Sequence, residues 1–176
     1  MPNWVKSIAI FGTKKVLEDC IVDKENGHKS FDLDKVIPMP KEYEKENPFE
    51  GMTMEEELLF KKANDGCKDW YEWRVKHWGT KWNTDETVVL DDNMVTFNTA
   101  WNMPDEVFRE ISKKYHTTVK VVYADESMTE NSGYIVYDNG HVTVNEMGDV
   151  DSESEKFRDS VWDESVIYES DVWDME

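Results

Sequence analysis

Hydrophobic and polar positions near the start of the chain follow first the period of a strand and then that of a helix. The run from Trp4 to Phe11 is apolar and β-branched and stops at Gly12, which predicts a buried strand. We expect a short helix to follow, with Thr13 as its cap. The apolar positions of this helix share one face and are Val16, Leu17, Cys20 and Ile21.

The second half of the chain predicts strands joined by tight turns and one helix. The predicted strands are 86–90, 94–101, 118–123, 133–137 and 141–144. Asp91-Asp92-Asn93 and Asp138-Asn139-Gly140 are typical hairpin connections, and Pro104 opens a helix that ends near Lys114. In strand 94–101 the alternation predicts that Val95, Phe97, Thr99 and Trp101 lie on one face, under the helices.

The order of these elements indicates a fold class. Apart from the middle of the chain, it runs strand, helix, strand, strand, helix, strand, followed by a hairpin. That order is the split βαβ arrangement of ferredoxin-like sandwiches, in the α+β class. We therefore expect an antiparallel sheet with two helices on one face, in a domain of residues 1–148 that carries a helical insertion at about 41–82.

The insertion has two parts of different composition. Residues 41–66 are dominated by charge, with one helical patch at 54–63 that we interpret as a solvated helix, because its acids precede its bases as the helix dipole prefers. Residues 69–82 instead crowd together four tryptophans and a tyrosine. The simplest interpretation is that these aromatic side chains anchor the insertion to the sheet, because tryptophan buries a large area.

The charge of the chain restricts its partners. Its 176 residues hold 39 acidic and 20 basic side chains, for a net charge of −19. Such a surface would repel a phosphate backbone, so direct nucleic-acid binding is not expected and a basic protein partner is favoured. Residues 149–176 form an acidic tail with eleven acidic and two basic side chains. Its aromatic residues either dock on the domain or form a linear motif for a partner with an apolar groove.

Four short motifs occur in a fixed order along the chain. They are Met1-Pro2-Asn3-Trp4, Ile37-Pro38-Met39-Pro40, the stretch from Trp78 to Asn83, and the stretch from Phe97 to Trp101. In this order they resemble the YubB-like family of phage and plasmid proteins, over about residues 1–145. The resemblance implies a ferredoxin-like domain and a mobile-element origin, but no particular activity. Family members carry a cysteine where Val5 follows Trp4 here, so no thiol role is transferred.

Catalytic signatures are absent from the sequence. The four histidines are scattered without the spacing of metal ligands, and there is no phosphate-binding glycine-rich loop. We therefore predict no metal and no cofactor. The best remaining constellation runs from His77 to Asn83, where His77 and Lys81 would be catalytic if Asp69 or Glu72 approached them.

Targeting signals and disulfides are also not expected. The chain has no apolar run long enough to span a membrane, and its first residues do not resemble a secretory signal. Both features predict a protein of the bacterial host cytosol. In that reducing compartment Cys20 and Cys67 are expected to be free thiols.

These features favour a non-enzymatic, acidic binding protein of a phage or plasmid. We expect it to occupy the basic, nucleic-acid-binding surface of a host protein such as a defence nuclease, as an anti-defence inhibitor of which an anti-CRISPR protein is one kind. The predicted binding residues are Trp78, Lys81, Trp82, Trp162, Asp163, Glu164 and Trp173. Two alternatives stay open: a small enzyme that acts on RNA or a nucleotide through residues 77–83, and a self-associating accessory protein that forms a homodimer.

Overall fold

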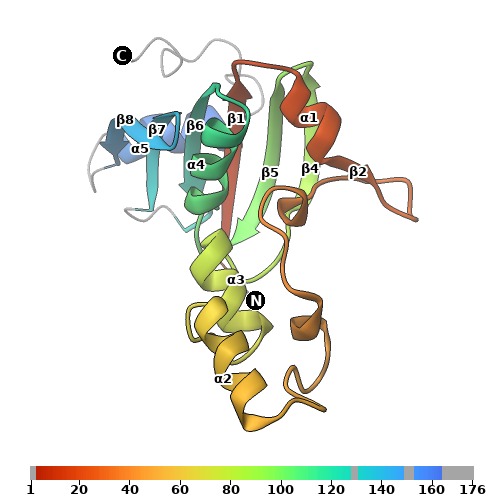
Figure 1. The fold of residues 1–176 in the computed structure, drawn as a ribbon. Coiled ribbons are helices and arrows are strands. Elements are labelled where there is room, and N and C mark those ends of the chain that lie inside the picture. The colour runs from red at the N-terminus through yellow and green to blue at the C-terminus, as the bar shows by residue number, and fades with distance from the viewer. Residues whose placement is uncertain (1–2, 128–130, 149–152, 164–176) are drawn as a thin grey trace.

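A six-stranded antiparallel sheet forms the body of the protein (Figure 1). The computed structural model describes residues 3–127, 131–148 and 153–163. The strands are β1 (Trp4–Phe11), β4 (Asp85–Asp91), β5 (Met94–Ala100), β6 (Thr118–Asp125), β7 (Ser132–Asp138) and β8 (His141–Met147). They lie in the order β4-β5-β1-β6-β7-β8. The first strand of the chain is therefore at the centre of the sheet, paired with β5 and β6.

Helices α1 (Lys15–Cys20) and α4 (Asp105–Lys114) make the two crossover connections of the sheet. The first lies between β1 and β4, which are separated by β5, and the second lies between β5 and β6, which are separated by β1. Each connection thus skips one strand, as a split βαβ unit requires. The predicted α+β ferredoxin-like fold is confirmed.

The face of the sheet under α1 and α4 holds the larger core. Phe31, Phe97 and Phe108 stack in sequence, with ring centroids 5.2 and 6.0 Å apart. Val95 and Phe97 are fully buried on this face, as the alternation along β5 predicts. The prediction was wrong for Trp101, which follows the end of β5 and is 52% exposed. Its backbone has left the extended conformation, so alternation no longer decides where its ring points.

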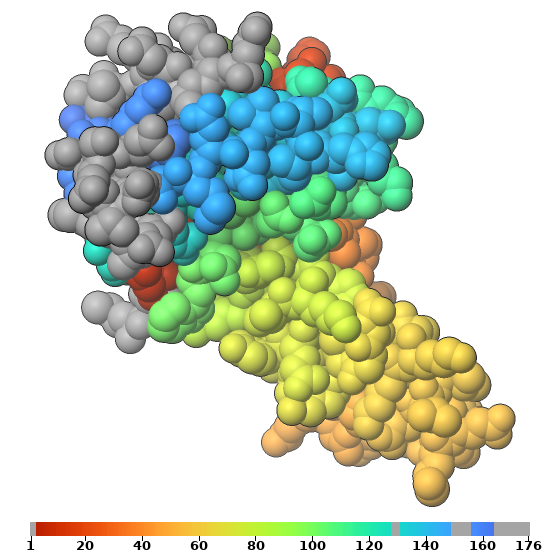
Figure 2. Space-filling view, turned by 90° about the vertical axis from the view of Figure 1, so that its left-hand side faces the viewer, coloured from red at the N-terminus to blue at the C-terminus, as the bar shows by residue number. Residues whose placement is uncertain are grey.

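Between α1 and β4 the chain makes a small hairpin and then an arm. The hairpin consists of β2 (Ile21–Asp23) and β3 (Lys29–Phe31). Ile21 therefore begins a strand, although the sequence predicted that it belongs to the preceding helix. Two 3-10 turns follow, at Leu33–Lys35 and Lys41–Glu44, and then α2 (Met54–Ala63) and α3 (Trp70–Trp78). We call residues 41–78 the arm, because they project from the body of the molecule (Figures 1 and 2).

Helix α3 was not predicted, although its ends carry clear signals. Asp69 caps its start, with Oδ1 accepting a hydrogen bond from the Glu72 amide at 2.8 Å. Gly79 ends it with a φ of 83°, a left-handed conformation that glycine adopts without strain. The helix buries only Trp73 and Trp78, which are five residues apart, so its apolar pattern lacks the usual helical period.

Helix α5 (Glu153–Trp162) covers the opposite face of the sheet, mainly over β6 and β7. Phe157 and Val161 are 2% and 0% exposed and pack with Ile8, Val122 and Tyr134. The sheet therefore has helices on both faces, one more layer than the sequence predicts. Helix α5 lies within the predicted acidic tail, and it docks on the domain.

Tyr43 connects two segments of the arm and makes the stability of the protein depend on pH. The side chain is 1% exposed, and its hydroxyl donates a hydrogen bond to the Cys67 carbonyl at 2.8 Å. Burial raises the pKa of Tyr43 to about 12. A tyrosine in the unfolded chain has a pKa of about 10. Below pH 10 both states keep the proton, and above it the unfolded chain ionises first, so the free energy of unfolding falls as pH rises from 10 to 12.

We expect this alkaline loss to be smaller in Tyr43→Phe, which cannot ionise. Urea unfolding of both proteins at intervals between pH 8.5 and 11.5 measures it. The stability advantage of the wild type should shrink steadily above pH 10. Parallel curves for the two proteins would contradict the assignment.

Candidate interaction surface

Three tryptophans and a lysine gather where β1 begins and β5 ends. The Trp4 and Trp82 ring centroids lie 6.2 Å apart. The Lys81 ammonium lies 4.1 Å from the centroid of the Trp82 ring and 5.6 Å from that of the Trp101 ring. Trp82 and Trp101 are 38% and 52% exposed. We call Trp4, Lys81, Trp82 and Trp101 the indole surface.

Trp101 is held in a backbone conformation that costs free energy. Its φ is 71°, and the Asn102 amide donates to the Ala100 carbonyl at 2.9 Å, so Trp101 is the central residue of a tight three-residue turn. Such γ-turns with positive φ are rare and strained, and a bulky side chain makes the strain worse. A strained residue whose large ring is also half exposed is a candidate for function.

Hydrogen bonds from distant segments hold this turn in place. The Trp101 amide donates to the Asn3 carbonyl at 2.8 Å, and Asn131 Nδ2 donates to the Trp101 carbonyl at 2.9 Å. The Thr80 hydroxyl donates to the Ala100 carbonyl at 2.8 Å. Residues from the start, middle and later part of the chain therefore set the conformation of Trp101. A strained backbone conformation persists only where the surrounding structure holds it in this way.

The indole surface is suited to bind a cation. Indole faces carry negative electrostatic potential and attract ammonium and guanidinium groups. Lys81 already occupies such a position over two of the rings. An arginine or lysine side chain of a partner would be recognised by the same chemistry.

The two residues of the enzymatic alternative have different roles in the structure. His77 stacks on Trp73 with centroids 4.3 Å apart, its Nδ1 lies 2.9 Å from the Trp73 carbonyl oxygen, and its Nε2 lies 3.1 Å from Asp65 Oδ2. Both ring nitrogens are thus engaged within the arm, while Lys81 belongs to the indole surface. The structure shows no contact between His77 and Lys81 that would make them one catalytic unit.

The carboxylates expected to approach His77 are engaged elsewhere. Asp69 caps α3, and Glu72 forms an ion pair with Lys68 at 2.6 Å that lowers the pKa of the Glu72 carboxyl. Asp65 takes their place beside His77. A cavity of about 280 Å³ next to this pair is lined by side chains of both charges, the bases Lys76 and Arg109 and the acids Glu106 and Glu110.

Trp78 is a core residue, which corrects its assignment to a binding surface. It is 1% exposed, its Nε1 donates to the Ile37 carbonyl at 2.9 Å, and its ring packs edge-on against Trp73. This is the anchoring role that the sequence offered as the simplest interpretation of the tryptophan-rich stretch.

Four of the predicted binding residues belong to the acidic tail. Two of them lie at the end of the docked helix α5, and two lie outside the described residues. Trp162 Nε1 donates to the Ala124 carbonyl at 3.2 Å, and the Lys6 ammonium lies 5.3 Å from the centroid of its ring. Asp163 is exposed at the end of α5. Glu164 and Trp173 lie outside the described residues. The structure thus brings Lys81 and Trp82 together but places Trp162 on another part of the sheet.

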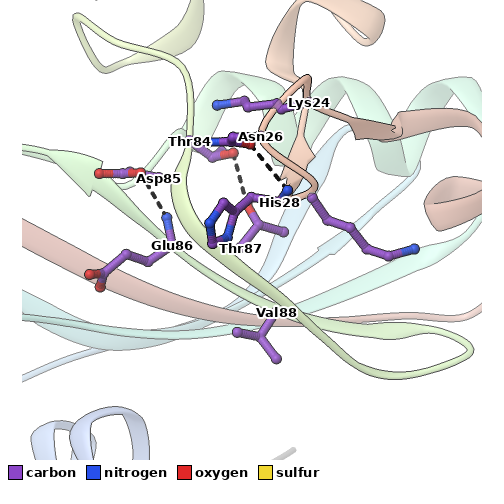
Figure 3. Close-up of a pocket in the computed structure, with 9 residues that line it drawn as sticks. Lys24, Asn26, His28, Thr84, Asp85, Glu86, Thr87 and Val88 are labelled. Atoms are coloured by element: carbon purple, nitrogen blue, oxygen red, sulfur yellow. Dashed lines mark hydrogen bonds between the residues drawn. The ribbon is translucent and has the colours of Figure 1, made fainter.

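A cleft of about 350 Å³ separates the β2–β3 hairpin from the start of β4 (Figure 3). Lys24, His28 and Lys29 line one side, and Asp85 and Glu86 line the other. All five side chains are exposed. The buried Thr84 hydroxyl at its base already donates to the Phe31 carbonyl at 2.7 Å. The cleft therefore contains no buried, unpaired group that would select a ligand.

Among residues 3–127, 131–148 and 153–163, no three His, Cys, Asp or Glu side chains are arranged to hold a metal ion. In the same ranges no helix has the length and apolar character needed to cross a membrane. Cys20 and Cys67 are free thiols, as predicted. Both are buried, and burial raises the pKa of both thiols.

Two members of the indole surface, Trp4 and Trp101, were not predicted from the sequence. Both occur in the four family-like motifs, but their patterns predicted strand residues. A break after this strand was indicated only by Met103, because the residue before a proline, here Pro104, is disfavoured in the helical conformation. The positive φ of Trp101 has no signal in the local sequence.

Comparison with known proteins places part of this fold in a family. Residues 77–168 match the family model described as the ferredoxin-like domain in Api92-like protein. Among solved structures the chain is similar to the crystal structure of the protein api92 from Yersinia pseudotuberculosis, with 18% sequence identity and a TM-score of 0.42. The alignment covers 48% of this chain and 32% of that chain, so it spans about a third of that relative. No curated protein matches the chain.

Proposed function

We propose a function for this chain from its surface, because it belongs to the family defined by the ferredoxin-like domain of Api92-like proteins and that description names no activity. The protein is a protein-binding module that engages a basic partner. The indole surface is the observation that carries this proposal. Tryptophan is enriched among residues that dominate binding energy in protein interfaces. Trp82 and Trp101 present such rings to solvent.

Charge supports a basic partner. The net charge of −19 attracts a positively charged protein over distance, and the indole rings would then receive its arginine or lysine side chains. Lys81 shows that a cation fits over Trp82 and Trp101. A phosphate backbone would have neither of these advantages.

A more specific form of the proposal assigns the partner to the host of a mobile element. The YubB-like motifs support a phage or plasmid origin and action in the bacterial cytosol. A host protein with a basic, nucleic-acid-binding surface, such as a defence nuclease, has the charge that this chain complements. In this form the protein acts as an anti-defence inhibitor by occupying that surface.

Trp101→Gly tests the proposal with little risk to the fold. Glycine accepts a φ of 71° without strain, and this relief opposes the loss of ring contacts and the greater freedom of the unfolded chain, so we expect the free energy of unfolding to change by less than about 1 kcal/mol. Loss of the ring should weaken binding of a labelled nona-arginine peptide at least fivefold in fluorescence anisotropy titrations at low salt. The substitution leaves net charge unchanged, so weaker binding would reflect the ring alone. Equal affinities for both proteins would refute the role of Trp101.

Lys81→Ala distinguishes a basic from an acidic partner. If the rings receive a cation, removal of Lys81 frees their faces and removes a positive charge, so the peptide should bind more tightly. If Lys81 itself contacts an acidic partner, a nona-glutamate peptide should bind the wild type and lose affinity in the variant. That second result would overturn the proposal of a basic partner.

Capture from bacterial lysate then tests the host-protein form. Immobilised wild-type protein should retain basic, nucleic-acid-binding proteins at low salt and release them at high salt, and Trp101→Gly should retain less of them. If the retained proteins are the same for both baits, or none is basic, the anti-defence proposal fails.

A further inference from the structure

Helix α2 displays large apolar side chains on the outside of the arm. Met54, Leu58 and Leu59 are 90%, 69% and 60% exposed, and none of the ten residues of the helix is buried. Isolated exposed apolar residues are common, but Met54 and Leu58 are one turn apart and lie on the same helical face. A short helix with its apolar side chains facing solvent fits an interface better than a solvated surface.

The helix is held from its other side, so this face is fixed in its exposed orientation. Phe60 packs on Tyr43 and Phe49, with ring centroids 5.2 and 6.3 Å apart. Phe60 lies two residues from Leu58, on the opposite side of the helix. Thr53 closes a capping box with Glu56, in which the Thr53 hydroxyl accepts from the Glu56 amide at 3.2 Å. The helix is therefore anchored and capped without using Met54 or Leu58.

The charges along α2 point to a particular partner. Glu55, Glu56 and Glu57 occupy its first turn, and Lys61 and Lys62 occupy its last turn. A helix that is acidic at one end and basic at the other is complementary to a copy of itself in the antiparallel direction. A two-fold axis perpendicular to the helix produces that direction.

Glu55 and Lys62 make this complementarity specific. They are seven residues apart, two turns along the same flank of the Met54–Leu58 face. A two-fold axis near Leu58 brings that flank against its counterpart, so Glu55 of each copy lies beside Lys62 of the other. On the opposite flank Glu57 and Lys61 already pair at 2.5 Å within one helix. Both Glu55 and Lys62 are exposed, and neither has an ion pair among the described residues.

We propose that α2 is a self-association site, where a second copy of this chain packs antiparallel with Leu58 against Leu58. This inference goes beyond the proposed function, because it concerns the arm and not the indole surface. One helix face per copy is smaller than the roughly 800 Å² that each partner contributes to a standard interface. We therefore expect a weak dimer, with a dissociation constant on the order of 10 to 100 µM.

Sedimentation equilibrium of the full chain from about 1 to 500 µM tests the site through a charge swap. The wild type should show a monomer–dimer equilibrium, and Leu58→Glu should be monomeric. Glu55→Lys alone and Lys62→Glu alone should each weaken dimerisation at least tenfold, because both place like charges together. The double variant, Glu55→Lys with Lys62→Glu, should restore it, since the pairs reform with reversed sign.

Control variants separate the site from general charge effects. Glu25→Lys changes the net charge as Glu55→Lys does, but on the exposed β2–β3 hairpin, and it should leave the dimer unchanged. Far-ultraviolet circular dichroism should show the wild-type fold in every variant, because the altered side chains are exposed. A wild type that stays monomeric throughout the range, or a double variant that does not recover, would overturn the proposal.

Discussion

Replacing Trp78 by alanine is expected to lower the free energy of unfolding by about 3 to 5 kcal/mol, the range for large aromatic truncations in a core. The ring is 1% exposed and packs against Trp73, and the Arg74 guanidinium lies 4.9 Å from its centroid. Alanine would leave a cavity between α3 and the segment that carries Ile37. Urea unfolding followed by circular dichroism measures the loss.

Two further variants show where this free energy comes from. Trp78→Phe keeps most of the volume but removes the hydrogen bond to the Ile37 carbonyl, so it should cost about 1 to 2 kcal/mol. Trp82→Ala, four residues away, should cost less, about 1 to 2 kcal/mol, because its ring is 38% exposed and loses less buried area. If Trp78→Ala were as mild as Trp82→Ala, the placement of Trp78 in the core would be wrong.

Phe157→Ala should have the second large effect, because Phe157 holds α5 against the sheet. It is 2% exposed in a cluster with Ile8, Val122 and Tyr134, and the truncation should cost about 3 to 5 kcal/mol. Undocking of α5 would also open the helix to trypsin at Lys156 and Arg158. We therefore expect faster cleavage at these sites in the variant, measured by mass spectrometry.

The same packing decides how the tail should be shortened. A chain that ends at Gly148 loses α5 and exposes the apolar second face of the sheet, so it should aggregate or unfold. A chain that ends at Asp163 keeps α5 and its buried Phe157 and Val161, so it should stay folded and in solution. Equal behaviour of the two shortened chains would contradict the docking of α5. Only the second is suitable for testing the tail in binding experiments.

Local patterns were sufficient for the sheet and its two crossover helices. The strands β5 and β6 have β-branched or aromatic residues in alternation, and α4 has an apolar stripe between acidic and basic ends. In both cases the residues that decide the structure are neighbours in sequence. Their order along the chain then identified the split βαβ topology.

The candidate site was only partly accessible to sequence analysis. Lys81 and Trp82 were identified because tryptophan-rich segments are rare, and Trp78 was grouped with them because it is nearby in sequence. Gly79 ends the helix between them, so Trp78 turns into the core while Lys81 and Trp82 reach the surface. Helix α2 was predicted within its observed bounds, but its exposed leucines become evident only when Phe60 is seen to be the anchoring residue.

The sequence by itself thus determined the fold class, the acidic charge and the free state of both cysteines. Only the tertiary structure decided the position of Trp101, the docking of α5 and the separation of His77 from Lys81. The physical reason is the range of the interactions involved. Alternation and capping act over a few residues, whereas the turn at Trp101 is held by Asn3, Thr80 and Asn131, which meet only in the folded chain.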